Sequence, residues 1–179
     1  MSDVVKRDTV IPAAASQAPV LEREALTARE FLAFVIAEET YALPLHAIRE
    51  ILKPPPITPV PRAPGDVLGV VAVRGTITTV IDLRRRLRVA ESPPDKHTRI
   101  LLVAAEDEVL GVLVDQVLSV HRLLDDEIEL SGVVGGDLSD YVLGVGRPRR
   151  SRRDREGERD TESETEEILV LLDPEPLLD

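Results

Sequence analysis

The stretch GVVAVRGTITTVIDLRRRL, residues 69–87, consists of two apolar runs that meet at Arg74-Gly75. Small and β-branched residues favour strands, and a glycine in the second place of a tight turn tolerates a positive φ. The stretch therefore predicts a β-hairpin. Arg74 is less expected, because it closes a run in which a strand normally stays apolar. Either it supports the fold by hydrogen-bonding nearby backbone, or it presents its guanidinium to a partner.

The flanking sequence predicts more short strands of the same kind. Residues 30–45, EFLAFVIAEETYALPL, are apolar on both faces and are interrupted by Glu38-Glu39-Thr40, which predicts a hairpin packed on both sides. RILLVAA (99–105) and VLGVLVDQVLSV (109–120) predict another hairpin, and YVLGVG (141–146) a further strand. Short strands separated by Gly and Pro turns indicate a mostly β barrel or sandwich.

Few segments predict a helix. In HAIREIL, residues 46–52, the apolar residues fall at helical spacing, and the helix is expected to end before Pro54. Asp82 precedes LRRRL and is expected to cap a turn or short helix by accepting a backbone N–H. The last residues predict a strand followed by a short C-terminal helix.

The chain divides into a tail and one domain. Residues 1–28 show no sustained period and are expected to form a flexible N-terminal tail, with the domain at 29–179. Within the domain, residues 147–167 contain almost nothing apolar and pass from arginine-rich to acidic. Such charge blocks are normally solvated, so this segment is expected to be a disordered insertion between two strands.

Composition excludes several classes of function. With 22 Lys and Arg against 33 Asp and Glu, the formal charge is −11, which argues against nucleic-acid binding. There is no Cys, and His46, His97 and His121 lack metal-ligand spacing, so no cofactor is expected. No apolar stretch approaches the ~18 residues of a membrane span, which predicts a cytoplasmic protein without direct membrane insertion.

Two carboxylates are the best candidates for catalysis. Asp82 and Asp115 each follow an apolar strand, and a close pair of carboxyl groups could perform the acid–base chemistry of a small hydrolase. Capping is favoured for Asp82. Because no serine–histidine pair or metal cluster accompanies them, the sequence predicts that the protein is not an enzyme.

The order of these segments resembles the chemotaxis coupling proteins of the CheW family. The resemblance rests on FLAFVIAEETYALPLHAIREIL, on ITPVPRAPGDVLGVVAVRGTITTVIDLRRRL, on ILLVAAEDEVLGVLVDQVLSV, and on YVLGVG with ILVLLD. It covers residues 29–146 and 168–179, and the R-G-x-[IV]-x-x-[VI]-[IV]-D-L core is its most specific part. It implies two interlocked five-stranded SH3-like barrels with one or two short helices, and no catalytic activity.

The resemblance also implies partners. Members of the family are adaptors between the cytoplasmic tip of methyl-accepting chemotaxis receptors and the regulatory domain of a CheA-type histidine kinase. The chain is therefore expected to be recruited to the inner face of the membrane by receptor arrays, and to be a monomer when free. A related pathway that controls surface motility, development or gene expression is the alternative output.

The family's receptor groove can be carried over residue by residue. Arg74 matches the arginine of the R-G turn beside that groove. The other positions that the resemblance places around the groove are Ile48, Glu50, Ile51, Val114, Val117 and Gly144. For the kinase contact, strand ends and hairpin turns are expected, without assigned residues. The insertion at 147–167 departs from the family, which usually joins its last strands by a short turn.

Overall fold

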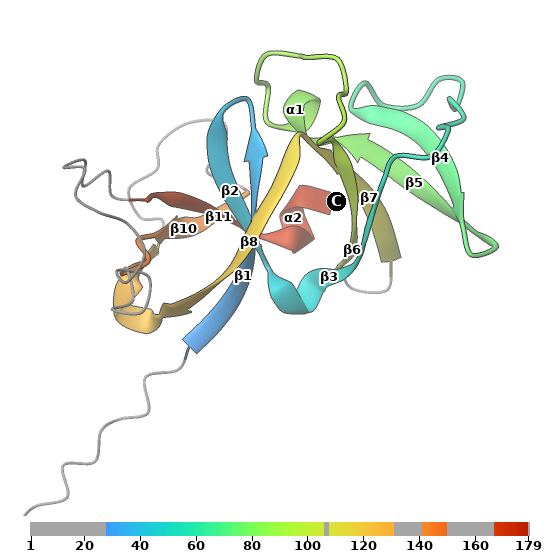
Figure 1. Cartoon of the computed structure of the whole chain (residues 1–179). Helices are drawn as coiled ribbons and strands as arrows, with labels where there is room; N and C mark the ends of the chain where they lie inside the picture. The colour runs from blue at the N-terminus through green and yellow to red at the C-terminus, as the bar shows by residue number, and fades with distance from the viewer. Residues whose placement is uncertain (1–27, 106–107, 131–140, 150–166, 179) are drawn as a thin grey trace, which may run out of the picture.

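The protein is described by a computed structural model that covers residues 28–105, 108–130, 141–149 and 167–178. All but the last residue of the predicted tail, and most of the predicted insertion, lie outside these residues. Figure 1 shows the elements in chain order: β1 (Ala28–Ile36), β2 (Glu39–Pro44), η1 (Leu45–Ala47, a 3-10 turn), β3 (Ile48–Leu52), β4 (Val67–Val73), β5 (Thr76–Asp82), α1 (Leu83–Arg86), β6 (Arg99–Ala105), β7 (Glu108–Val114), β8 (Gln116–Leu124), η2 (Asp125–Glu127, 3-10), β9 (Ile128–Leu130), β10 (Val142–Gly146), β11 (Leu169–Leu172) and α2 (Pro174–Leu178).

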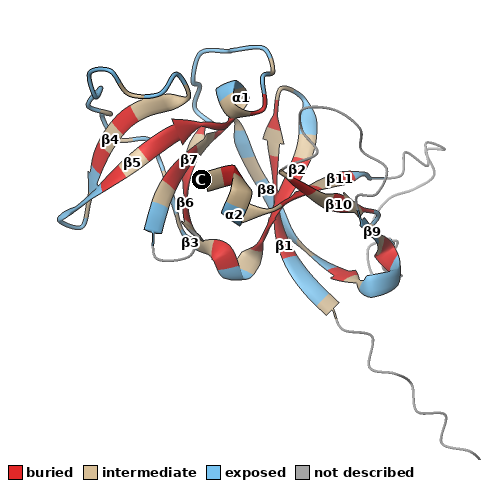
Figure 2. Cartoon of the chain, turned by 180° about the vertical axis from the view of Figure 1, so that it is seen from behind, coloured by how far each residue is buried: buried red, intermediate tan, exposed pale blue. Residues whose placement is uncertain are grey.

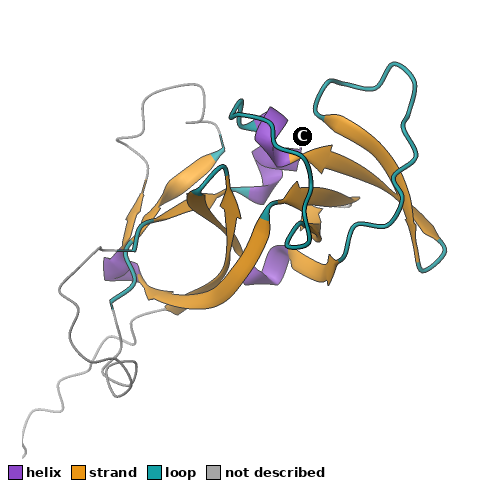
Figure 3. Ribbon diagram, turned by 45° about the horizontal axis from the view of Figure 1, so that its top comes forward, coloured by secondary structure: helices purple, strands orange, loops and turns teal. Residues whose placement is uncertain are grey.

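The strands of the described residues form two sheets. The first has the order β8-β1-β2-β11-β10-β9, and the second the order β3-β6-β7-β5-β4. Neighbours are antiparallel except β2 with β11 and β5 with β7. Figure 3 shows that the strands of each sheet curl rather than lie flat, and that the sheets stand side by side. The predicted mostly β fold with short helices is confirmed. Of the two five-stranded barrels that the resemblance implied, the second sheet has five strands, and the first has six because it includes the three-residue β9.

The hydrophobic core lies partly between the sheets and partly within each. Along β1, Leu32, Phe34 and Ile36 join the largest cluster, whereas Phe31 and Ala33 join a smaller cluster made only by strands of the first sheet. The largest cluster also takes residues from the second sheet and from α2: Ile81, Leu101, Val103, Val112 and Leu177. Successive residues of a strand point to opposite faces, so β1 is apolar on both faces because both are covered. Figure 2 shows the buried residues concentrated where the sheets meet around α2.

The prediction of a helix over residues 46–52 is wrong. Leu45–Ala47 form a 3-10 turn, and Ile48–Leu52 form β3, which pairs antiparallel with β6. A register shift between Ile48 and Glu50 places an extra residue in the strand. A segment this short is too brief to fix a helical period, and a short helix gains little on its own, so pairing with β6 prevails.

Residues 109–120 contribute to two strands, one on each side of Asp115, and Asp115 follows a strand as expected. β7 ends at Val114 and pairs with β6, which confirms the predicted hairpin. β8 then begins at Gln116 and pairs with β1 in the other sheet. Asp115 is therefore the residue at which the chain passes from the second sheet back to the first.

Candidate partner-binding site

The turn at Arg74-Gly75 has a left-handed backbone at both of its central residues. Val73 pairs with Thr76, so the turn has two residues, with φ of +50° at Arg74 and +84° at Gly75. Positive φ at both places is the geometry that suits the right-handed twist of a hairpin. Gly75 adopts it without strain, whereas an L side chain at Arg74 is disfavoured there. The Arg74 side chain is 80% exposed.

Arg74 is paired with Glu50. One guanidinium nitrogen of Arg74 donates to Oε1 of Glu50 at 2.8 Å, and the Glu50 side chain is 29% exposed. Glu50 lies on β3 and Arg74 follows β4, and these are the two edge strands of the second sheet. The ion pair therefore links the two edge strands of the second sheet. An exposed ion pair contributes only about 0–1 kcal/mol, so this pair stabilises the fold only weakly.

Four other predicted residues, three on the second sheet and Val117 on β8 of the first, differ in exposure. Ile51 is 44% exposed. Ile48 is half-buried and packs against the largest core cluster, as does Val117 on β8. Val114, at the end of β7, is 1% exposed and belongs to that cluster. Of the predicted residues, Arg74 and Ile51 are therefore exposed and Glu50 is partly exposed, whereas Val114 lies in the core.

Gly144 lies in β10 of the first sheet, and Figure 1 shows β10 on the opposite side of the molecule from β4 and β5, whose turn carries Arg74. It pairs with Leu130 of β9. A Cβ atom added at Gly144 would overlap the backbone carbonyl of Glu129. Glycine is required here because the neighbouring strand approaches too closely for any side chain.

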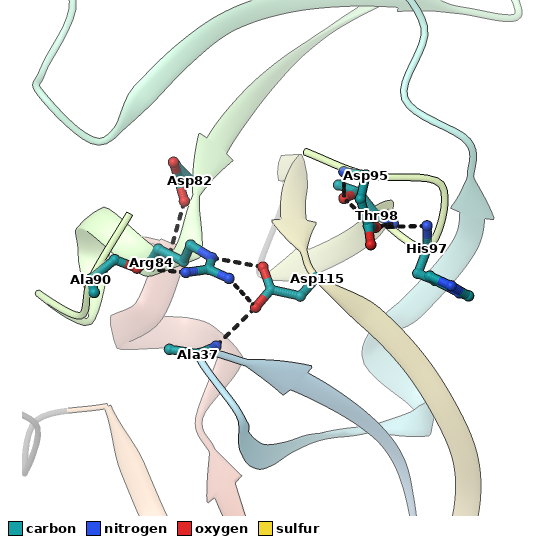
Figure 4. Close-up of polar contacts among 8 residues, drawn as sticks. All are labelled: Ala37, Asp82, Arg84, Ala90, Asp95, His97, Thr98 and Asp115. Carbon is teal, nitrogen blue, oxygen red and sulfur yellow. Dashed lines mark hydrogen bonds and ion pairs between the residues drawn. The ribbon is translucent and has the colours of Figure 1, made fainter. Parts of the chain in front are cut away.

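The two candidate catalytic carboxylates are both engaged by Arg84 (Figure 4). Asp82 accepts the backbone N–H of Arg84 at 2.9 Å, which confirms that it caps α1. Asp115 accepts Nε of Arg84 at 2.7 Å and a terminal guanidinium nitrogen at 2.5 Å, and also the backbone N–H of Ala37 at 2.8 Å. These contacts give both carboxylates structural roles, and the arrangement gives no support to the hydrolase alternative.

A cavity of about 480 Å³ lies beside Asp115 and apart from the predicted binding residues. Its apolar walls are Pro54, Ile57, Leu68, Pro93, Pro94 and Leu113. The adjoining loop is held by Asp95, which accepts the N–H groups of His97 at 2.7 Å and Thr98 at 3.1 Å. These hydrogen bonds, His97 first, keep the pKa of Asp95 below its usual range. Within the described ranges no group of three His, Cys, Asp or Glu side chains could hold a metal ion.

The sequence reasoning missed the arginines of α1. Arg84 joins Asp115, Arg85 donates to the Gly65 carbonyl at 3.0 Å, and Arg86 donates to the Leu177 carbonyl at 2.9 Å. LRRRL was expected to form a turn or short helix after Asp82, with no role assigned to its arginines. The sequence did contain a basic run and an aspartate between two apolar runs, and that was the available signal. Because Arg84 and Asp115 are 31 residues apart in the chain, the sequence alone does not indicate that they pair.

The sequence is similar to those of known proteins. The sequence model of the CheW-like domain matches residues 30–179. A chemotaxis protein CheW of Helicobacter pylori is 32% identical over 118 residues, which is 66% of this chain and 72% of that protein. Protein FrzA of Myxococcus xanthus is 32% identical over 126 residues, 70% of this chain and 78% of that protein.

A solved structure shows the same fold. The crystal structure of the scaffolding protein TtCheW from Thermoanaerobacter tengcongensis superposes with a TM-score of 0.70 at 24% sequence identity. The match covers 84% of this chain and 92% of that one. Among the described residues, no helix is both long enough and apolar enough to span a membrane.

Proposed function

The chain belongs to the CheW-like domain family, and from this membership we propose that it is a noncatalytic adaptor in a chemosensory array. It couples the cytoplasmic tips of methyl-accepting chemotaxis receptors to the regulatory domain of a CheA-type histidine kinase. The protein is cytoplasmic and is recruited to the inner face of the membrane by its receptors. The family match over residues 30–179 supports this assignment.

The receptor site centres on Arg74, Glu50 and Ile51. The observation that carries the proposal is that Arg74 is 80% exposed, keeps an unfavourable backbone conformation and contacts Glu50 on β3, the strand that also carries the 44%-exposed Ile51. A guanidinium offers several donors to the carbonyls and carboxylates of a helix tip, and Ile51 adds apolar contact. Ile48 and Val117 form the half-buried floor, and Val114 lies in the core beneath it. Gly144 lies apart from this surface, between β9 and β11 of the first sheet, and is not part of the proposed contact.

Kinase coupling tests the proposal directly. Autophosphorylation of a CheA-type kinase from the same genome is measured with its receptor, with and without this protein. We expect the protein to make kinase activity depend on receptor, and Arg74→Glu to abolish that effect. Arg62→Glu is the matched control, because Arg62 is also exposed with a positive φ of 62° but lies outside the proposed site.

A charge exchange separates binding from support of the fold. In the double variant Arg74→Glu with Glu50→Arg, the two charges can still pair across the second sheet. If Arg74 acts on the receptor, coupling stays lost in the double variant. Recovery of coupling would show that the ion pair matters only for the fold, and would remove Arg74 from the receptor contact.

The cellular output has two candidates. The first is chemotaxis. The second is a related pathway that controls surface motility, development or gene expression, and the similarity to FrzA, which is not named as a chemotaxis protein, supports it. Both readings require the same adaptor contacts. A deletion strain tested for swimming in gradients and for surface spreading distinguishes them, because only the affected behaviour should fail.

A further inference from the structure

Three hydrogen-bonded groups join the two sheets at the point where the chain crosses between them. Arg84 lies in α1, directly after β5 of the second sheet. Its guanidinium meets both oxygens of Asp115, at 2.7 Å from Nε and 2.5 Å from a terminal nitrogen. Asp115 in turn accepts the N–H of Ala37, in the β1–β2 turn of the first sheet. Arg84, Asp115 and the Ala37 amide are called the inter-sheet bridge (Figure 4).

The bridge is rigid and largely shielded. The Arg84 side chain is 14% exposed and that of Asp115 is 27% exposed. The remaining terminal nitrogen of Arg84 donates to the carbonyl of Ala90 at 2.5 Å, so all three guanidinium nitrogens have partners. The backbone N–H of Asp115 also donates to the Val35 carbonyl at 3.1 Å. A planar fork on a carboxylate fixes orientation as well as distance.

The β1–β2 turn that receives the bridge has a left-handed backbone. Ala37 and Glu38 have φ of +50° and +72°, a conformation that L residues seldom adopt. Ile36 pairs with Glu39, so these are the two central residues of a hairpin turn, for which positive φ at both places is the usual geometry. The hydrogen bond that the Ala37 N–H donates to Asp115 ties this turn of the first sheet to α1, which follows the second.

We propose that the inter-sheet bridge sets the angle between the two sheets and thereby positions the receptor site, with Arg84 as the positioning residue. This inference rests on the proposed function, because the site takes Glu50 and Ile51 from the second sheet and Val117 from the first. Val117 lies two residues after Asp115, so a rotation at the bridge moves it relative to β3. Arg84 itself is not a receptor contact.

The test measures sheet orientation and receptor binding separately. Residual dipolar couplings of backbone amides in β1–β2 and β6–β7 report the relative orientation of the sheets in the free protein. Affinity is measured for the cytoplasmic tip fragment of a receptor from the same genome. Arg84→Lys keeps the charge but loses the two-pronged contact with Asp115. Arg85→Lys is the matched control, because the described partners of Arg85 are Gly65, Asp82 and Glu91, which keep it on the second-sheet side.

We expect Arg84→Lys to change the orientation between the sheets, to leave each sheet's internal couplings intact, and to weaken receptor binding by about tenfold. Arg85→Lys should change neither. An unchanged orientation in Arg84→Lys overturns the inference, and a changed orientation with unchanged affinity overturns its link to the receptor. Should Arg84→Lys not fold, Asp115→Asn keeps one acceptor oxygen and decides by the same readouts. If the unmodified protein fails to bind the receptor, the proposed function falls while the orientation data still decide the role of the bridge.

Discussion

At the scale of single residues, Arg74 contradicts the local preference of its turn. Asn-Gly is the favoured pair for a two-residue hairpin turn with positive φ, yet the chain has Arg before Gly75. The ion pair with Glu50 is too exposed to explain that choice by stability alone. Departures of this kind are expected at functional positions, and this answers why a charged side chain ends an apolar strand.

Replacing Arg74 tests this reasoning. Arg74→Asn should leave the free energy of unfolding within about 1 kcal/mol of the original, because relief of the disfavoured φ offsets loss of the ion pair. Urea denaturation measures the change. A loss of several kcal/mol would show instead that Arg74 is a structural residue.

Gly144 leads to a prediction about packing. Gly144→Ala should lower the free energy of unfolding by about 1–3 kcal/mol and displace β9, because the added methyl group meets the Glu129 backbone. Thermal unfolding and hydrogen exchange of the β9 amides measure the two effects. Gly65→Ala is the control, since a Cβ at Gly65 meets nothing within 4 Å. Equal behaviour of the two variants would contradict the assigned role.

At the scale of elements, strands were predictable wherever their apolar pattern was long. Residues 30–45 and 69–82 carry enough β-branched and aromatic residues to identify both hairpins, and Asp82 before LRRRL identified the cap of α1. β3 was misjudged because five residues fit either period and only pairing with β6 decides. The sequence placed Asp115 after a strand, but it did not show that the chain passes there to the other sheet, because that depends on which strands β7 and β8 pair with. For the site, the resemblance pointed to Arg74 and Glu50, whereas their mutual contact depends on long-range pairing.

We predict that most of the charged insertion can be replaced without loss of stability. Gly146 pairs with Leu169, so the strands that flank the insertion already meet. Replacing residues 150–166 with about eight Gly and Ser residues should change the free energy of unfolding by less than about 1 kcal/mol, because loop closure depends weakly on length. Arg149 is retained, since it is paired with Asp126 at 3.0 Å. A large loss of stability in chemical denaturation would show that the insertion packs on the domain.

The loop at 91–98 should be sensitive to acid through Asp95. Its pKa is lowered in the fold by the N–H groups of His97 and Thr98, so the charged form stabilises the loop. That contribution is complete above the unfolded pKa of about 3.9 and is lost as the pH falls through the lower folded pKa. Melting temperatures of the original and of Asp95→Asn should differ at neutral pH and converge in acid. A difference in melting temperature that persists below both pKa values would show that Asp95 stabilises the loop through its geometry rather than its charge.

At the scale of the whole molecule, the two sheets share one core and should not unfold separately. The largest cluster takes Phe34 from the first sheet, Leu101 from the second and Leu177 from α2. Arg86 strengthens this junction, because it donates to the Leu177 carbonyl and lies 5.9 Å from the centre of the Tyr141 ring. Loss of α2 packing should therefore be felt in both sheets.

Leu177→Ala tests this coupling. Leu177 is fully buried, so removing its side chain should lower the free energy of unfolding by about 2–5 kcal/mol. Leu178 is half-buried, so Leu178→Ala is the control and should lower the free energy of unfolding by less. Hydrogen exchange of amides in β1 and β6 under mild denaturant should accelerate equally in Leu177→Ala, because both strands contribute to the cluster. Acceleration confined to one sheet would mean that the sheets unfold independently, and their relative orientation would then depend on the inter-sheet bridge alone.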